Sequence, residues 1–176
     1  MAFNAGDPGH VDEHNRLAAD GAIAAPHGGI YFTDDVATEI VTTGEMVKAA
    51  GVTEYSSAMR HQVDDGGTNN RLRYTGPSLH FHAVAQCSIN FVSGTNQTAA
   101  IQVFRYDAAA GIGQLIAHSL AVAVAPGQNV MQITTHCDAM LSDGDYLELH
   151  VANNSGTNNI TVNEGYLFIM GMRRTV

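Results

Sequence analysis

Positive charge is scarce in this sequence of 176 residues. Eight Lys and Arg stand against 17 Asp and Glu, which gives a formal net charge of -9 at pH 7. Binding nucleic acid through phosphates requires a basic patch, and the one basic pair is Arg173-Arg174, so we expect no nucleic-acid partner. Charged residues make up only 14%, against about 25% in a typical soluble domain, which suggests a surface buried against another subunit.

Cysteine, tryptophan and long apolar runs are also rare or missing. Cys87 and Cys137 are too few for a disulfide scaffold and match no zinc motif. Both fall in apolar registers, so we expect buried thiols. No apolar run approaches the ~20 residues of a membrane span, and the first residues do not resemble a signal peptide. Tryptophan, which often stacks on sugars, is absent, although Tyr55 or Tyr106 would offer a surface site for a host glycan.

The most regular pattern in the chain runs from Leu79 to Val92. Every second residue from Leu79 to Phe91 is apolar, and the residues between them are mostly polar. Strict alternation over this length predicts a long strand with one face in a core. A strand of this kind needs neighbours on both sides, which the rest of the chain must supply.

Short alternating segments with frequent turn signals follow residue 29. We expect about eight to ten strands and no long helix, which is typical of an antiparallel sandwich or barrel. Gly165 permits a bulge within the last strand. The expected strands are 30–33, 39–42, 45–48, 71–75, 79–92, 98–106, 114–125, 129–137, 146–152, 160–162 and 166–172.

The first 29 residues differ from the rest and form an expected N-terminal arm. Asp7 followed by Pro8 is a good helix start, and Gly21 can end the helix. Such a helix has about three turns and would be marginal alone in water. Gly28-Gly29 is an expected hinge. The predicted organisation is therefore an arm over residues 1–29 and one all-β domain over residues 30–176.

Two stretches resemble TNF/C1q-like jelly rolls. The segment 141–149, Leu-Ser-Asp-Gly-Asp-Tyr-Leu-Glu-Leu, is similar to a turn of that family, and 164–171, Glu-Gly-Tyr-Leu-Phe-Ile-Met-Gly, is similar to its last strand. The segment 71–76, before the long strand, resembles the jelly rolls of bacteriophage structural proteins. The resemblance covers most of residues 71–172, and it implies an antiparallel jelly-roll sandwich that assembles as a homotrimer for structure or recognition.

The opening segment 3–8, together with Asn15, resembles the N-terminal segment by which phage fibre and decoration proteins attach to the particle. This resemblance implies a virion protein, assembled in the host cytoplasm, that binds the major capsid protein or another virion protein. The attachment residues that it implies are Phe3, Asp7, Pro8, Val11, Asn15 and Leu17.

A different class of protein is suggested by His80 and His82. With Gly76 and Gly94 they resemble the first motif of cupins, which are metal-dependent jelly-roll enzymes, and two His at i and i+2 can reach one metal. However, Gln86 stands at the carboxylate position, and the third His of the second cupin motif is missing after Pro126-Gly127. His80 and His82 also lie on the polar face, whereas cupins need their ligands inside the barrel. We therefore expect no metal, no cofactor and no enzyme activity.

Three functions remain open from the sequence. A trimeric decoration protein on the capsid is the first, because no coiled-coil heptad or repeat that could form a fibre shaft lies between residues 27 and 71. A tail fibre or receptor-binding knob is the second. A cupin-type enzyme is the third, from another class.

Overall fold

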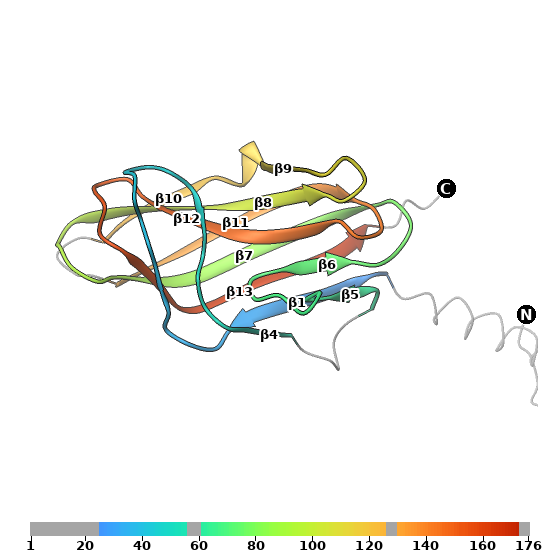
Figure 1. Ribbon diagram of the computed structural model, residues 1–176, viewed down its shortest axis with the longest axis horizontal. Coiled ribbons are helices and arrows are strands. Elements are labelled where there is room, and N and C mark those ends of the chain that lie inside the picture. The colour runs from blue at the N-terminus through green and yellow to red at the C-terminus, as the bar shows by residue number, and fades with distance from the viewer. Residues whose placement is uncertain (1–24, 56–60, 126–129, 173–176) are drawn as a thin grey trace, which may run out of the picture.

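The computed structural model describes residues 25–55, 61–125 and 130–172. In these ranges the chain forms two antiparallel sheets that face each other (Figure 1). Sheet A has the strand order β11-β7-β13-β1-β4, with β2 paired to β13. Its strands are β1 (His27–Phe32), β2 (Ala37–Thr38), β4 (Thr53–Tyr55), β7 (Leu79–Phe91), β11 (Val130–Leu141) and β13 (Ile160–Met172).

Sheet B has the order β10-β8-β12-β6-β5, with β3 paired to β12 and β9 paired to β8. Its strands are β3 (Val47–Lys48), β5 (Val63–Asp64), β6 (Leu72–Tyr74), β8 (Gln97–Asp107), β9 (Ile112–Leu115), β10 (Ala121–Ala125) and β12 (Tyr146–Asn153). A single 3-10 turn, η1 (Ala117–Ser119), precedes β10. The architecture is the all-β jelly-roll sandwich that the sequence predicts.

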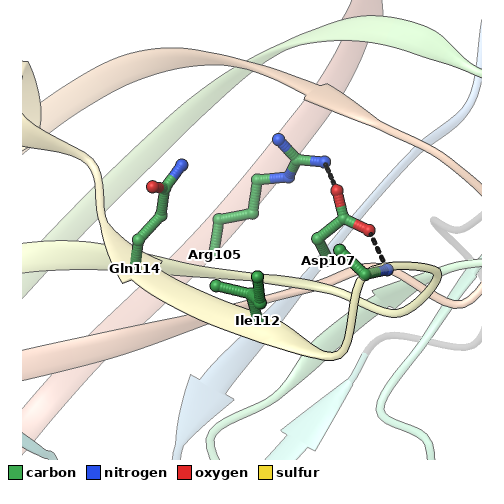
Figure 2. Close-up of a pocket in the computed structure, with 5 residues that line it drawn as sticks. Arg105, Asp107, Ile112 and Gln114 are labelled. Atoms are coloured by element: carbon green, nitrogen blue, oxygen red, sulfur yellow. Dashed lines mark hydrogen bonds and ion pairs between the residues drawn. The ribbon is translucent and has the colours of Figure 1, made fainter.

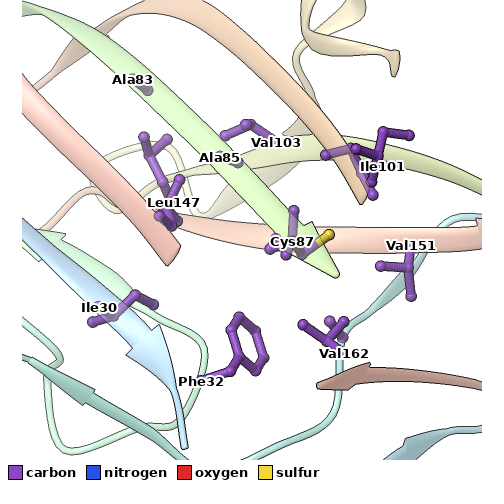
Figure 3. Close-up of a cluster of buried hydrophobic side chains, with 14 of the residues drawn as sticks. Ile30, Phe32, Ala83, Ala85, Cys87, Ile101, Val103, Leu147, Val151 and Val162 are labelled. Atoms are coloured by element: carbon purple, nitrogen blue, oxygen red, sulfur yellow. The ribbon is translucent and has the colours of Figure 1, made fainter. Parts of the chain in front are cut away.

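The long strand β7 lies near the centre of sheet A, between β11 and β13. Its alternate side chains from Phe81 to Phe91 are at most 1% exposed, as its pattern predicts. They meet the inward side chains of sheet B, such as Val103 and Leu147, in one apolar core (Figure 3). The opposite side chains of β7, which include His80 and His82, lie on the outer face of sheet A.

The turn in segment 141–149 is organised by a buried aspartate. Asp145 is 1% exposed and accepts hydrogen bonds from the backbone N–H groups of Ser142 and Ala108 and from Arg105. Before it, Gly144 has a φ of 85°, a conformation that favours glycine. The motif therefore closes the β11–β12 connection and ties it to the end of β8.

The last strand carries the predicted irregularity. The register between β13 and β7 shifts between Val162 and Glu164, which is a β-bulge. A Cβ atom on Gly165 would lie 3.0 Å from the Cβ of Cys87, so glycine lets the two strands remain close there. Beyond the bulge, Leu167 and Ile169 point into the core at 0% exposure.

Two strand predictions were wrong. Residues 114–125 do not form one strand but are divided by η1 into β9 and β10; Ser119 donates its hydroxyl to the carbonyl of Ile116, which holds this turn. Residues 39–42 are not a strand either. The N–H of Ile40 donates to the side chain of Asn159 and so takes no part in a sheet ladder.

The expected hinge at Gly28-Gly29 was also wrong, because both glycines lie inside β1 and pair with Ile169 and Phe168 of β13. A Cβ on Gly29 would lie 3.0 Å from the ring of Phe168, so glycine leaves room for that ring. The sandwich therefore begins at His27 rather than at residue 30. The predicted arm helix lies outside the described residues.

Candidate functional site

The outer face of sheet A is the candidate functional site, because it carries the predicted histidines. Nδ1 of His82 donates a hydrogen bond of 2.9 Å to Oδ1 of Asp138 on β11. His80 pairs in the register with Met140 on one side and Met172 on the other. Both histidines point away from the core, as predicted, and this differs from the inward ligands that a cupin requires.

More histidines gather around Asp138 than the sequence analysis identified. The ring of His136 lies 5.6 Å from that of His82, centroid to centroid. The hydrogen bond from His82, aided by the charges of His82, His118 and His136 nearby, holds the pKa of Asp138 below its usual range. We call His80, His82, His118, His136 and Asp138 the histidine cluster. A signal for it was present, because His136 and Asp138 occupy the polar register of the strand after Pro126-Gly127.

Metal binding by these side chains finds no support in the geometry. Across residues 25–55, 61–125 and 130–172, no group of three or more His, Cys, Asp or Glu side chains is placed to hold a metal ion. Gln86, at the position where cupins have a carboxylate, accepts a hydrogen bond of 3.2 Å from the hydroxyl of Tyr166. We therefore derive no reaction step from His80 and His82.

Next to the histidine cluster, the same face of sheet A carries exposed apolar side chains. Tyr166 and Met170 on β13 are 40% and 52% exposed, and Tyr31 on β1 is 41% exposed. Val84 and Phe168 pair with each other in the register between β7 and β13 and are partly exposed. We call Tyr31, Val84, Tyr166, Phe168 and Met170 the apolar strip.

The charges of the described residues are divided unequally between the sheets. All four described Lys and Arg side chains lie in sheet B or directly before β6, and each is paired with a carboxylate. These pairs are Lys48–Glu148, Arg71–Glu148, Arg73–Asp64 and Arg105 with Asp107 and Asp145. The described part of sheet A has no Lys or Arg. Its outer face therefore offers no permanent positive charge to a partner.

Small cavities lie on both sheets of the described structure. One, of about 120 Å³, lies beside the β13 bulge on the outer face of sheet A and is lined by Gln86, Ser88, Gln132, Glu164 and Tyr166, among others. It brings together amides, hydroxyls and one carboxylate. None of these is a nucleophile held by a neighbouring base, as covalent catalysis would require.

The other cavity, of about 160 Å³, lies against the β8–β9 hairpin and is lined by Arg105, Asp107, Ala110, Ile112 and Gln114. Figure 2 shows Asp107 bridging the Arg105 guanidinium and the N–H of Ala110. Arg105 also binds Asp145 at 2.9 Å. Two carboxylates therefore already neutralise the only cation of this cavity, which makes it a poor site for an anion.

The sites predicted outside sheet A have different outcomes. The six attachment residues Phe3, Asp7, Pro8, Val11, Asn15 and Leu17 lie outside the described residues. Tyr106 stacks on Tyr146 with ring centroids 4.7 Å apart, so part of its ring is already covered. In the described ranges, no helix has the length and apolar character needed to cross a membrane.

Comparisons with known proteins give a fold and no family. No protein-family model and no curated protein matches the sequence. Among solved structures, Eiger TNF from S. frugiperda superposes with a TM-score of 0.63 at 8% identity, covering 87% of this chain and 96% of that chain. Murine APRIL at pH 8.0 and at pH 5.0 gives TM-scores of 0.51 and 0.50, at 10% and 11% identity, each covering 82% of this chain and 98% of that chain. The chain therefore has a TNF-like jelly-roll fold.

Proposed function

We propose that the protein is a trimeric decoration protein of a bacteriophage capsid, with a structural and not a catalytic role. The observation that carries this proposal is the outer face of sheet A. In the described residues this face exposes Tyr, Phe and Met side chains and has no Lys or Arg, and such a face is costly to leave in water. A large subunit interface removes that cost, which agrees with the low charge content of the chain.

Attachment to a phage capsid is supported by the resemblance of segment 3–8 and Asn15 to phage attachment segments. A short arm before a compact sandwich suits a site on a capsid shell, whereas a fibre would need a shaft between its anchor and its knob. The tail-knob alternative differs in location and not in fold, so the location of the protein on the particle separates the two. The outward direction of His80 and His82 disfavours the cupin alternative.

The experiment is a truncation designed on the strand boundaries. Removing residues 1–27 would delete the carbonyl of Pro26, which accepts a hydrogen bond from Gly171, and would shorten β1. We therefore remove residues 1–24 only. The truncated protein should still assemble as a trimer, with three times the mass of the shortened chain, and should fail to bind phage particles that lack the native protein.

Two controls make the result specific. Full-length protein must bind the same particles, and a Val41→Ala variant, changed at a side chain that is 73% exposed, must bind like the native protein. Normal decoration by the truncated protein would show that the arm is not the attachment device. Full-length protein found at the tail tip by imaging would place the protein on the tail instead.

A further inference from the structure

The last outward-facing row of side chains in sheet A places an exposed methionine on each side of a histidine. His80 on β7 pairs in the register with Met140 on β11 and with Met172 on β13. The two methionines are 48% and 40% exposed. We call Met140 and Met172 the methionine patch. It lies at the end of the sheet where β7 begins and where β11 and β13 end.

The segment 1–24 joins the sandwich beside this patch. The backbone N–H of Gly171 donates to the carbonyl of Pro26 at 2.6 Å, which continues the pairing of β13 with β1. The next pair in this register is Ala25 with Met172. The chain that precedes the described residues therefore starts directly at the methionine patch.

The sequence of this segment supplies an apolar surface that suits the patch. Val11, Leu17 and Ala18 fall at helical spacing in the expected arm helix, which is too short to be stable alone. Methionine side chains adapt their shape to an irregular partner, and an amphipathic helix binds such a surface with its apolar face. Packing on the methionine patch would bury both surfaces and stabilise the helix.

The connection between helix and sheet is long enough for this contact. The expected helix ends near Gly21, four residues before Ala25. Four extended residues span at most about 14 Å, and the three strand spacings from β1 to β11 also measure about 14 Å. A short tether gives an effective concentration on the order of millimolar, so this segment has the advantage over a second copy of the protein in dilute solution.

We propose that, before attachment, the segment 1–24 folds back and packs its apolar side chains against the methionine patch of its own chain. The inference deepens the proposed function and rests on it, because it names the place where the attachment arm is held until the capsid is met. Release of the arm is then a step of attachment. A protein whose arm is already free therefore binds particles with higher apparent affinity.

Trypsin tests the contact without any particle, because Arg16 is the only Lys or Arg in residues 1–24. The contact should slow cleavage after Arg16, which mass spectrometry follows through the product that lacks residues 1–16. Met140→Gln/Met172→Gln keeps the length of both side chains and removes their apolar character, so cleavage should become about tenfold faster. Val130→Gln, at a position 50% exposed at the far end of β11, is the matched control and should be cleaved at the native rate.

A cysteine cross-link is the second measurement, and it locates the arm on the sheet. The Leu17→Cys/Met172→Cys variant should form a disulfide within one chain when oxidised glutathione is added. In the matched variant, Leu17→Cys/Val130→Cys, the second thiol lies at the far end of β11, and no such disulfide should form.

The outcomes separate this inference from the function on which it rests. Native protein cleaved as fast as the double Gln variant, or equal cross-linking of the two cysteine pairs, overturns the inference. A double Gln variant that loses the trimer also overturns it, because the patch would then belong to the subunit interface. Where both measurements show the contact, failure of full-length protein to bind particles overturns the proposed function and leaves the contact standing.

Particle binding tests the release step. The double Gln variant should bind particles with a lower apparent dissociation constant than the native protein. Equal dissociation constants would show that release of the arm is not a step of attachment, which overturns that part of the inference.

Discussion

His82 and Asp138 face each other across strands β7 and β11, with Nδ1 and Oδ1 2.9 Å apart. The contact holds the pKa of Asp138 below its usual range, chiefly through the hydrogen bond from His82. His80, His118 and His136 have no second carboxylate within the cluster. His82 therefore sets the environment of the one carboxylate in this cluster.

The first prediction is that His82→Ala raises the pKa of Asp138. The hydrogen bond from His82 holds this pKa below its usual range, so its removal should move the titration of the carboxylate to higher pH. The measurement is an NMR titration of the Asp138 side-chain carboxyl carbon in both proteins.

The matching control is His61→Ala, because His61 pairs with β1 at the other edge of sheet A and is not part of the histidine cluster. This variant should leave the titration of Asp138 unchanged. An Asp138 pKa that is the same in His82→Ala as in the native protein would show that the contact with His82 does not stabilise the carboxylate.

The second prediction concerns Asn70, whose buried side chain joins two backbone segments by hydrogen bonds. Its amide donates to the carbonyls of Ala49 and Leu149, and its oxygen accepts from the N–H of Leu149, all at 2.8 to 3.0 Å. Asn70→Ala would leave these buried groups without partners, at about 1–3 kcal/mol for each unsatisfied group. We expect the free energy of unfolding to fall by about 3–5 kcal/mol, measured by denaturant unfolding.

Asn154→Ala is the control for this measurement, because Asn154 is exposed. Its effect should stay within about 0.5 kcal/mol. Asn70 also has a φ of 49°, which asparagine tolerates better than most residues. An Asn70→Ala loss no larger than that of the control would show that Asn70 does not hold the sheet together.

The comparison of Asn70 with β7 shows what the sequence can and cannot predict. The buried side chains of β7 are predictable because a half-buried strand alternates with period two. The polarity of each residue therefore indicates which face of the sheet it lies on. Asn70 lies in a run of Asp, Gly and Asn that composition identifies as a loop, and nothing local indicates that its amide reaches Leu149. A contact between residues that are far apart in the chain, such as Asn70 and Leu149, produces no periodic pattern in the sequence.

The candidate site divides in the same way. His80 and His82 were identified from one strand, and their outward direction follows from the alternation of that strand. Asp138 was not identified, because its contact with His82 depends on the register between β7 and β11. Other strands lie between these two in the chain, so no local turn fixes that register. The outward direction of Val122 and Val124 was also not identified. Residues 114–125 read as one alternating strand, whereas η1 divides this segment and sets which side chains of β10 face outward.

The third prediction is that both cysteines stay reduced and slow to react. Cys87 and Cys137 are 1% and 2% exposed, and burial raises their thiol pKa to about 12 and about 11. The thiolate, which is the reactive form, is therefore rare at neutral pH. A thiol reagent should label the native protein slowly and the unfolded protein fully, with Thr95→Cys as an exposed control that reacts at once. Rapid native labelling of both cysteines would contradict the core assignment.

The fourth prediction concerns Glu148, a carboxylate that is 5% exposed on β12. Burial alone would raise its pKa, but hydrogen bonds from His150 and Lys48 and the charges of Lys48 and Arg71 outweigh burial and lower it. A carboxylate with a lowered pKa stabilises the fold above its unfolded pKa, and that stabilisation is lost as pH falls through its folded pKa. The contribution is therefore complete at neutral pH and is lost only as the pH falls below the ordinary range of a glutamate.

Glu148→Gln keeps the shape of the side chain and removes its charge, so Lys48 and Arg71 lose their shared partner at 2.7 and 3.3 Å. Because both cations are partly exposed, we expect a loss of about 2 kcal/mol in unfolding free energy at pH 7. Urea unfolding over a series of pH values from 7 downward is the measurement, and Glu45→Gln, at an exposed position, is the control. The difference between native and variant should narrow as the pH is lowered through the depressed pKa of Glu148, because the native side chain then takes up a proton and loses the same charge. A difference that stays constant over the whole pH series would mean that side-chain packing, and not the charge of Glu148, stabilises this part of sheet B.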